Sequence, residues 1–300
     1  MIWARHKMAG QRVSGRLGSF AKSYVNRAVE RFNLRVETLT ARRVEDARLT
    51  ALKDRGQFDK PVFPLLPGFQ ECDVSVMGEA LRRYQADIAR MEWPATNSVG
   101  YFVDNDYCTS PDMEVYYSLI RITKPQVILE VGSGFSTQVA RQAICDGGLK
   151  AQIISIDPHP RTDIDIVCDV VVRSPLEDGN VDAHVRALTT NDILYVDSSH
   201  ELRCGNDVLR IVFEMLPLIR SGVLVHFHDV FLPYDYPWDF MFSQRVNWAE
   251  QYLLQAVLQY GDGFDVVWPG YYVQRTRQNF AQEFPTLRNG RAQSLWLRKR

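Results

Sequence analysis

The sequence predicts an α/β protein with a doubly wound sheet of about seven strands, helices on both faces and an N-terminal helical extension. Three observations support this prediction. Short apolar runs alternate with helical segments from residue 111 to residue 300. These runs contain few polar positions, which is typical of parallel strands buried on both faces. The 300 residues, 46% of them hydrophobic, suffice for one large core plus an extension.

Residues 1–55 form the predicted extension, which is basic and amphipathic. They contain 13 Lys and Arg against 5 Asp and Glu. Apolar residues recur at helical spacing between Phe20 and Phe32. Such a helix can touch an anionic membrane surface, or it can pack on its own protein or on a second copy in a homo-oligomer. We favour packing over membrane contact.

Residues 56–110 form a predicted Pro-rich linker and helical cap. The stretch FDKPVFPLLPG (58–68) contains three prolines, so we expect it to be extended. A helix is predicted over 76–91, ahead of the aromatic and polar stretch GYFVDNDYCTS (100–110).

Residues 111–300 form the predicted main domain. Helices are predicted over 112–123 and 136–148, the second closed by a Gly pair. A later helix has Asn247 as its predicted N-cap, Glu250 at the third position and Gly261 after its end. Five apolar runs are predicted strands: QVILEV (126–131), AQIISID (151–157), CDVVVR (168–173), DILYVD (192–197) and GVLVHFHD (222–229). Two later runs are predicted to form an antiparallel pair of strands: FDVVW (264–268) and SLWLRK (294–299).

Composition narrows the classes of function. The formal net charge of −1 offers no argument for a nucleic-acid partner. No run approaches about 18 apolar residues, and the first residues lack the apolar core of a signal peptide. The five cysteines are widely spaced, without a C-x-x-C pair, which favours reduced thiols and a cytoplasmic setting.

The stretch ILEVGSGFST (128–137) places a carboxylate beside a glycine turn at a strand end. Gly132 and Gly134 allow a tight turn and close approach to a ligand. A dinucleotide-binding turn usually has a third glycine where Thr137 stands here. Glu130 would repel a pyrophosphate but suits an ammonium or sulfonium, and Asp157 is placed to accept both hydroxyls of a ribose. A cation and a ribose without a diphosphate predict S-adenosylmethionine, with an NAD-dependent oxidoreductase as the less favoured alternative.

Five ordered segments carry a family resemblance: ILEVGSGFST, SIDPHP, DILYVDSSH, LPLIRSGVLVHFHDVFLPYDYP and SLWLRK. Over roughly residues 95–300 the chain resembles the class I S-adenosylmethionine-dependent methyltransferases, specifically the methyltransferase domain 24 family. The resemblance implies a Rossmann-like fold with residues 171–178 bordering the adenine. It also implies these cofactor contacts: Glu130, Gly132 and Gly134 at the methionine end, Ser136 and Thr137 beside them, and Asp157 on the ribose.

Structural alternatives exist for these residues. Glu130 could be a helix cap or a solvated strand end. Asp157 could serve as a turn former before Pro158. The two glycines could serve chain geometry alone.

A second cluster carries the predicted reaction chemistry. Asp197 and His200 follow the fourth apolar run, and His228 and Asp229 follow the fifth. Because parallel strands end at one edge of a sheet, we expect these four side chains to converge. His226 shares a face with His228, but we interpret it as a core histidine.

The energetics of O-methylation require help in removing the proton. A hydroxyl has a pKa near that of water, roughly 15.7, whereas histidine lies near roughly 6.5. Histidine therefore acts in concert with methyl transfer, or a divalent cation lowers the pKa of the hydroxyl. In the similar catechol and macrolide-sugar O-methyltransferases, acids after the fourth and fifth strands bind Mg²⁺ and a base follows the first acid by three residues.

That resemblance maps the acids to Asp197 and Asp229 and the base to His200, with His228 as a further candidate ligand. The chain departs from the catechol enzymes, because His228 and Asp229 stand where those have Asp-Asn. The segment FLPYDYPWDF (231–240) is either a substrate-facing wall or a loop packed on the next helix. The sequence therefore predicts O-methylation of a small-molecule hydroxyl, on a sugar or glycosylated metabolite, with Mg²⁺ as an optional cofactor. A non-catalytic binding or assembly module is the alternative.

Overall fold

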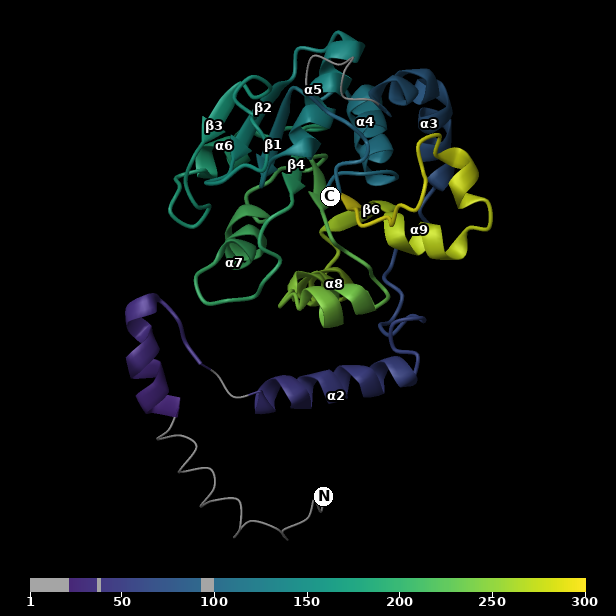
Figure 1. The fold of residues 1–300 in the computed structure, drawn as a ribbon. Helices are drawn as coiled ribbons and strands as arrows, with labels where there is room; N and C mark the ends of the chain where they lie inside the picture. The colour runs from purple at the N-terminus through teal and green to yellow at the C-terminus, as the bar shows by residue number, and fades with distance from the viewer. Residues whose placement is uncertain (1–21, 37–38, 93–99) are drawn as a thin grey trace. The chain divides into compact units, whose positions relative to one another are not determined.

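The computed structural model describes residues 22–36, 39–92 and 100–300 (Figure 1). The chain forms two compact units, residues 1–55 and 56–300, which we describe separately. The predicted cap and main domain thus fall within one unit, and their separation at residue 110 stays a prediction. All five cysteines are free thiols.

The first unit contains helical residues 22–29, the 3₁₀ turn η1 (Glu30–Phe32) and helix α2 (Thr40–Asp54). Phe20 and Ala21, which begin the predicted helical pattern, lie outside the described residues. Among the described residues of this unit only Leu49 is buried. Tyr24, Phe32 and Val44 are exposed apolar side chains. Membrane contact and packing on a second copy both stay predictions for this surface.

The second unit begins with an extended segment and helix α3 (Val74–Ala89), which is followed by η2 (Arg90–Glu92). The N–H groups of Val62 and Phe63 both donate to the carbonyl of Pro233, which fixes the extended segment on the domain. Asp73 caps α3 by accepting a hydrogen bond from the backbone N–H of Ser75. The apolar face of α3 packs against α4 (Asp112–Thr123).

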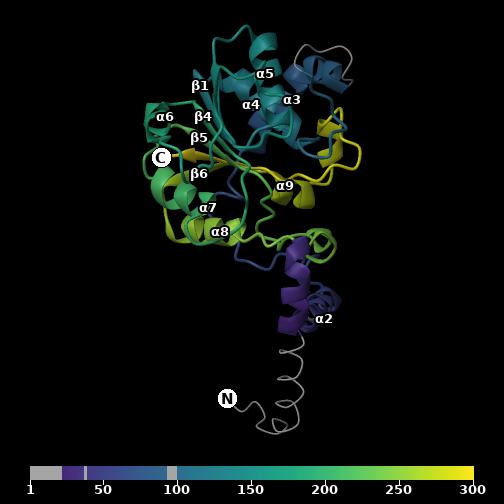
Figure 2. The same ribbon diagram turned by 60° about the vertical axis from the view of Figure 1, so that its left-hand side comes forward.

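The centre of this unit is a seven-stranded sheet in the order β3-β2-β1-β4-β5-β7-β6, so the predicted fold class is confirmed (Figure 2). Strands β1 to β5 pair in parallel, and β7 is antiparallel to both β5 and β6. The predicted antiparallel pair is therefore present. The strands are β1 (Val127–Val131), β2 (Gln152–Ile156), β3 (Val170–Val172), β4 (Ile193–Val196), β5 (Leu224–Phe227), β6 (Phe264–Pro269) and β7 (Leu295–Lys299).

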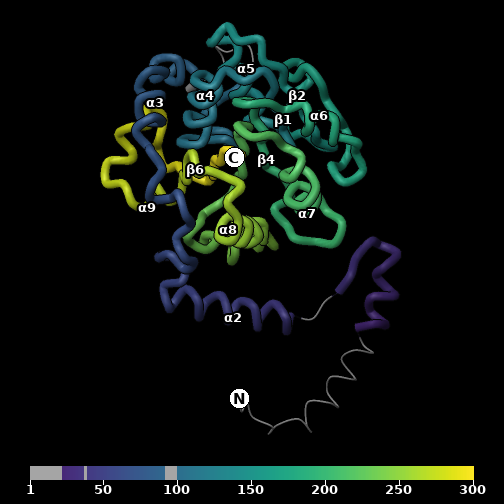
Figure 3. The backbone as a smooth tube through the Cα atoms, turned by 180° about the vertical axis from the view of Figure 1, so that it is seen from behind, coloured from purple at the N-terminus to yellow at the C-terminus, as the bar shows by residue number. Residues whose placement is uncertain are grey.

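Two apolar cores cover the two faces of the sheet, because successive strand residues point to opposite sides. In β1, Ile128 joins the core under α3, α4 and α5, whereas Leu129 joins the core under α6, η4 and α8. Figures 1 and 3 show α4 and α5 on one side of the sheet and α7 and α8 on the other. The remaining helices are α5 (Phe135–Gly147), α6 (Asp182–Ala187), α7 (Asp207–Arg210) with its continuation η4 (Ile211–Met215), η5 (Asp239–Gln244), α8 (Glu250–Tyr260), α9 (Gly270–Thr276) and η6 (Phe280–Glu283). No helix in the described part of the chain has the length and apolar character that a membrane crossing requires.

The predicted N-cap of α8 is wrong. Helix α8 begins at Glu250, with Ala249 rather than Asn247 at the N-cap and no side-chain cap. Instead, the backbone oxygen of His200 accepts hydrogen bonds from the N–H groups of Ala249 and Glu250, at 2.8 and 3.1 Å. A backbone carbonyl from a distant loop thus satisfies donors that a side chain was expected to satisfy.

The aromatic segment 231–240 packs inward. Phe231, Tyr234 and Tyr236 are buried and form a cluster with Tyr271. The ring of Tyr236 also lies 5.4 Å from that of Tyr252 on α8. The packed-loop alternative therefore describes these rings better than a substrate-facing wall.

Candidate active site

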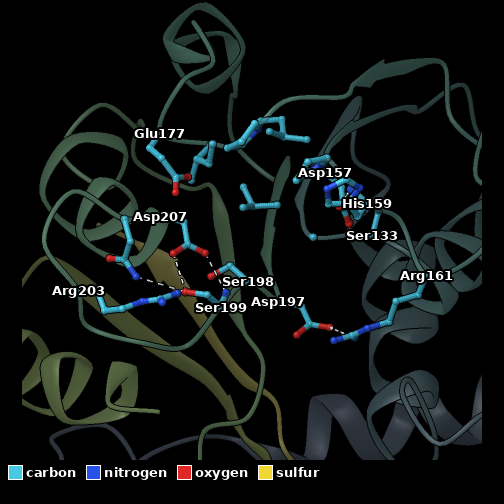
Figure 4. Close-up of a pocket in the computed structure, with 17 residues that line it drawn as sticks. Ser133, Asp157, His159, Arg161, Glu177, Asp197, Ser198, Ser199, Arg203 and Asp207 are labelled. Carbon is cyan, nitrogen blue, oxygen red and sulfur yellow. Dashed lines mark hydrogen bonds and ion pairs between the residues drawn. The ribbon is translucent and has the colours of Figure 1, made fainter. Parts of the chain in front are cut away.

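A cavity of about 310 Å³ lies beyond the carboxyl ends of β1, β2 and β4 (Figure 4). Its volume is at the lower end of the range for small-molecule sites. Figure 4 shows Asp157 and Ser133 on one side of it, Asp207 and Ser199 on the other, and Asp197 paired with Arg161 below. The segment predicted to border the adenine contributes three residues to the wall of this cavity: Pro175, Leu176 and Glu177.

Position 132 requires a glycine, both because of the backbone conformation there and because of the atoms around it. Its φ is +80°, a left-handed conformation that side chains disfavour. A Cβ built on Gly132 would lie 1.9 Å from the backbone oxygen of Asp197. The glycine turn therefore packs directly on the end of β4, where the predicted reaction residues begin.

Asp157 lines the cavity and also shapes its wall. Its carboxylate accepts hydrogen bonds from the backbone N–H of Ser133 at 2.8 Å and of His159 at 2.7 Å. The carboxylate also accepts from the Ser133 hydroxyl at 3.1 Å, so about one of its four acceptor positions remains for a ligand. The predicted contact with a ribose stays a prediction that this position allows.

Glu130 lies beneath the glycine turn rather than on the cavity. It is fully buried and accepts hydrogen bonds from the hydroxyls of Tyr116 at 3.0 Å and Thr137 at 2.5 Å. The Thr137 hydroxyl in turn accepts from the N–H of Gly134. Glu130 thus supports the turn through Thr137, and its predicted direct contact with the cofactor has no support in this geometry. Burial raises the pKa of Glu130 to about 7, although the two hydrogen bonds act in the opposite direction and lower this pKa.

This shift predicts a pH-dependent stability that E130Q removes. Because the folded pKa of about 7 exceeds the reference value of 4.5, Glu130 binds its proton more tightly in the folded state. Its stabilising contribution is complete below about pH 4.5 and is lost as pH rises through about 7. From pH 4 to pH 8, the free energy of unfolding should fall by roughly 3 kcal/mol more in the wild type than in E130Q. Urea unfolding at both pH values measures this, and parallel pH profiles would contradict it.

Asp197, His200 and Asp229 converge as predicted. The Nε2 of His200 lies 3.2 Å from Oδ1 of Asp197 and 3.4 Å from Oδ2 of Asp229. His200 and Asp229 both have positive φ, +58° and +56°, in the left-handed region that is costly for such residues. Among the described residues, ligand atoms of these three side chains lie within 4.8 Å of one another.

The other ring nitrogen of His200 contacts a residue that the sequence analysis did not assign to the site. Nδ1 lies 2.9 Å from Oε2 of Glu250, and both side chains are buried. Burial lowers the pKa of His200, but its hydrogen bonds to Asp197 and Glu250 raise it well above its usual range. Burial would raise the pKa of Asp197, but His228 and His200 hold it well below its usual range.

His228 does not join this group, which consists of Asp197, His200 and Asp229. The predicted metal ligand set of Asp197, Asp229 and His228 stays a prediction. The His228 ring instead lines a small second cavity with Ser136 and Asp197. His226 is a core histidine, as interpreted from the sequence. It is fully buried, its Nε2 lies 2.9 Å from the Ser294 hydroxyl, and its ring stacks on Tyr195.

Arg161 and Tyr107 are two further site residues that the sequence analysis missed. Arg161 lines both cavities, and its guanidinium lies 3.8 Å from Oδ2 of Asp197. It also lies over the ring of Tyr107, 4.6 Å from the ring centroid. Tyr107 is about half exposed, and its ring also stacks on that of Phe135.

Residues 129–230 match a family model described as a methyltransferase domain. The match covers about a third of the chain. The matched residues run from β1 to the residue after Asp229, so they include the glycine turn, Asp157 and all three clustered side chains. The match bears out the predicted resemblance to methyltransferases over these residues, whereas Glu250 lies outside the match.

Several solved structures resemble the chain. The methyltransferase PaMTH1 of Podospora anserina, bound to SAH, is 20% identical with a TM-score of 0.43, over 80% of this chain and 100% of that one. The O-methyltransferase of Bacillus cereus in complex with SAH is 13% identical with a TM-score of 0.39, over 74% and 90%. TomG of Streptomyces achromogenes, an O-methyltransferase of tomaymycin synthesis in complex with SAM, is 14% identical with a TM-score of 0.32, over 78% and 99%. No curated protein matches the chain.

Proposed function

We propose that the chain transfers a methyl group from S-adenosylmethionine to a hydroxyl of a small molecule, a sugar or a glycosylated metabolite. One observation carries this proposal. Asp197 belongs both to the wall of the 310 Å³ cavity and to the cluster with His200 and Asp229. A cofactor in the cavity would therefore present its methyl group next to a site that can remove a proton.

The charge of the cavity fits this cofactor. Four acidic side chains line it, Asp157, Glu177, Asp197 and Asp207, against the cations Arg161 and Arg203. An acidic wall favours a ligand that carries a sulfonium and an ammonium, and it disfavours a dinucleotide pyrophosphate. The acidic wall therefore supports a methyltransferase rather than an NAD-dependent oxidoreductase.

In the proposed reaction the neutral form of His200, which its raised pKa makes the minor form near pH 7, accepts the proton of the acceptor hydroxyl at Nε2. The hydroxyl oxygen forms a bond to the methyl carbon while the bond from that carbon to sulfur breaks, and the electron pair stays on sulfur. The sulfonium thereby becomes the neutral thioether of S-adenosylhomocysteine. Proton removal in concert with transfer avoids a free alkoxide, which histidine alone could not generate.

The same three side chains also fit a divalent cation. They offer two carboxylate oxygens and one imidazole nitrogen, and the other nitrogen of that imidazole contacts a carboxylate, as is usual for metal-binding histidines. A bound cation would lower the pKa of the acceptor hydroxyl. Since Nε2 has one lone pair, His200 serves either as the base or as a ligand, but not as both.

A chelator experiment tests the proposal and separates these two roles. Methyl transfer from labelled S-adenosylmethionine to a panel of nucleotide sugars and other hydroxylated acceptors is measured with and without EDTA. Activity that survives EDTA assigns Nε2 the role of base, whereas activity that falls and returns with Mg²⁺ or Mn²⁺ assigns it the role of ligand. No transfer to any acceptor, despite tight cofactor binding, would favour the non-catalytic module.

A further inference from the structure

We infer that Glu250 is a positioning residue, which fixes the ring of His200 so that Nε2 faces the reaction centre. This inference rests on the proposed function, because it assigns Nε2 to the reaction. The Glu250 carboxylate lies 2.9 Å from Nδ1 of His200, with side chains 1% and 5% exposed. A buried carboxylate at this distance accepts the Nδ1 proton and so determines which nitrogen faces Asp197 and Asp229.

The start of α8 also holds the backbone and the ring face of His200. The backbone oxygen of His200 accepts hydrogen bonds from the N–H groups of Ala249 and Glu250. The ring of Trp248 lies 4.7 Å from that of His200, and Trp248 pairs with Glu201 in an isolated β-bridge. Three consecutive residues, Trp248, Ala249 and Glu250, therefore contact the ring, the backbone and one ring nitrogen of His200.

Two further features accompany this arrangement. His200 holds a left-handed backbone conformation, which persists only where the surroundings impose it. The second carboxylate oxygen of Glu250, Oε1, is buried and has no hydrogen-bond partner in the described part of the chain. A buried carboxylate with an unsatisfied oxygen carries a desolvation cost.

Variants of Glu250 test this role against a purely structural one. E250Q keeps an acceptor oxygen but removes the charge, and E250L removes the acceptor as well. Q255L is the matched control, because Gln255 is a buried polar residue of the same helix that donates to the carbonyl of Pro64, not to His200. Each variant is measured for the fraction folded, SAH affinity, kcat per folded molecule, and the ¹⁵N and ¹H signals of the His200 ring.

The positioning role predicts a loss of kcat of about 10-fold to 100-fold in E250Q and a larger loss in E250L, the range for outer residues that orient an active-site imidazole. SAH affinity should stay within twofold, and the Nδ1 proton signal should shift in E250Q and vanish by solvent exchange in E250L. Q255L should lose stability but keep its kcat and ring signals. Wild-type kcat and unchanged ring signals in E250Q would overturn the inference, even if E250L fails to fold. If the wild type methylates no acceptor, the proposed function fails, and the ring signals alone decide the role of Glu250.

Discussion

His200→Ala is expected to lower the rate of methyl transfer by about 10²-fold to 10⁴-fold, the usual contribution of a positioned acid-base group. Affinity for S-adenosylhomocysteine should barely change, because His200 does not line the 310 Å³ cavity. The effect should appear in kcat rather than in cofactor binding, since Nε2 acts on the proton of the acceptor. Single-turnover transfer at saturating cofactor measures it.

His184→Ala is the control for this variant, because His184 lies on α6 and lines neither cavity. Its transfer rate should equal that of the wild type. A His200→Ala enzyme that turns over at the wild-type rate would remove His200 from the reaction, both as base and as metal ligand.

Gly132→Ala is expected to abolish measurable cofactor binding at micromolar concentrations and to destabilise the fold by about 2–5 kcal/mol. The new Cβ would lie 1.9 Å from the Asp197 backbone oxygen, a contact that only a backbone shift can relieve. Such a shift moves the glycine turn away from the end of β4 and so opens one wall of the cavity. Chemical denaturation and SAH titration measure the two effects.

Two other glycines provide matched controls. Gly148 has a positive φ of +58° but open space where a Cβ would be, so Gly148→Ala isolates the backbone cost, about 1–2 kcal/mol. The nearest atom to a Cβ on Gly134 is the Cβ of Arg161 at 3.4 Å, so Gly134→Ala tests a mild contact in the same turn. If Gly132→Ala behaves like Gly148→Ala and still binds SAH, close packing on Asp197 does not shape the site.

The strand pattern was predictable from the sequence because buried parallel strands are nearly continuous apolar runs with turn residues between them. The convergence of Asp197, His200 and Asp229 followed from the same reasoning, since each stands just after a strand of one parallel sheet. These predictions needed only local sequence patterns and one rule of topology.

Contacts between distant segments could not be predicted in this way. Glu250 stands 50 residues after His200, and its position near a helix start has a local explanation, the capping box. That explanation failed because the N–H groups at the start of α8 donate to the backbone carbonyl of His200 instead. Glu130 was expected to contact the ligand, but hydrogen bonds from Tyr116 of α4 and Thr137 of α5 hold its side chain below the turn. No sequence pattern indicates these two hydrogen bonds.

Calorimetric titration with S-adenosylhomocysteine and with NAD⁺, on the wild type and on Asp157→Ala, tests the central claim most directly. We expect one SAH to bind per wild-type chain and NAD⁺ to give no binding heat. Asp157→Ala should weaken SAH binding by about 1.5–3 kcal/mol, the range for hydrogen bonds to a charged group. Binding of NAD⁺ without binding of SAH would contradict the account, and unchanged SAH affinity in Asp157→Ala would show that the cofactor does not occupy this cavity.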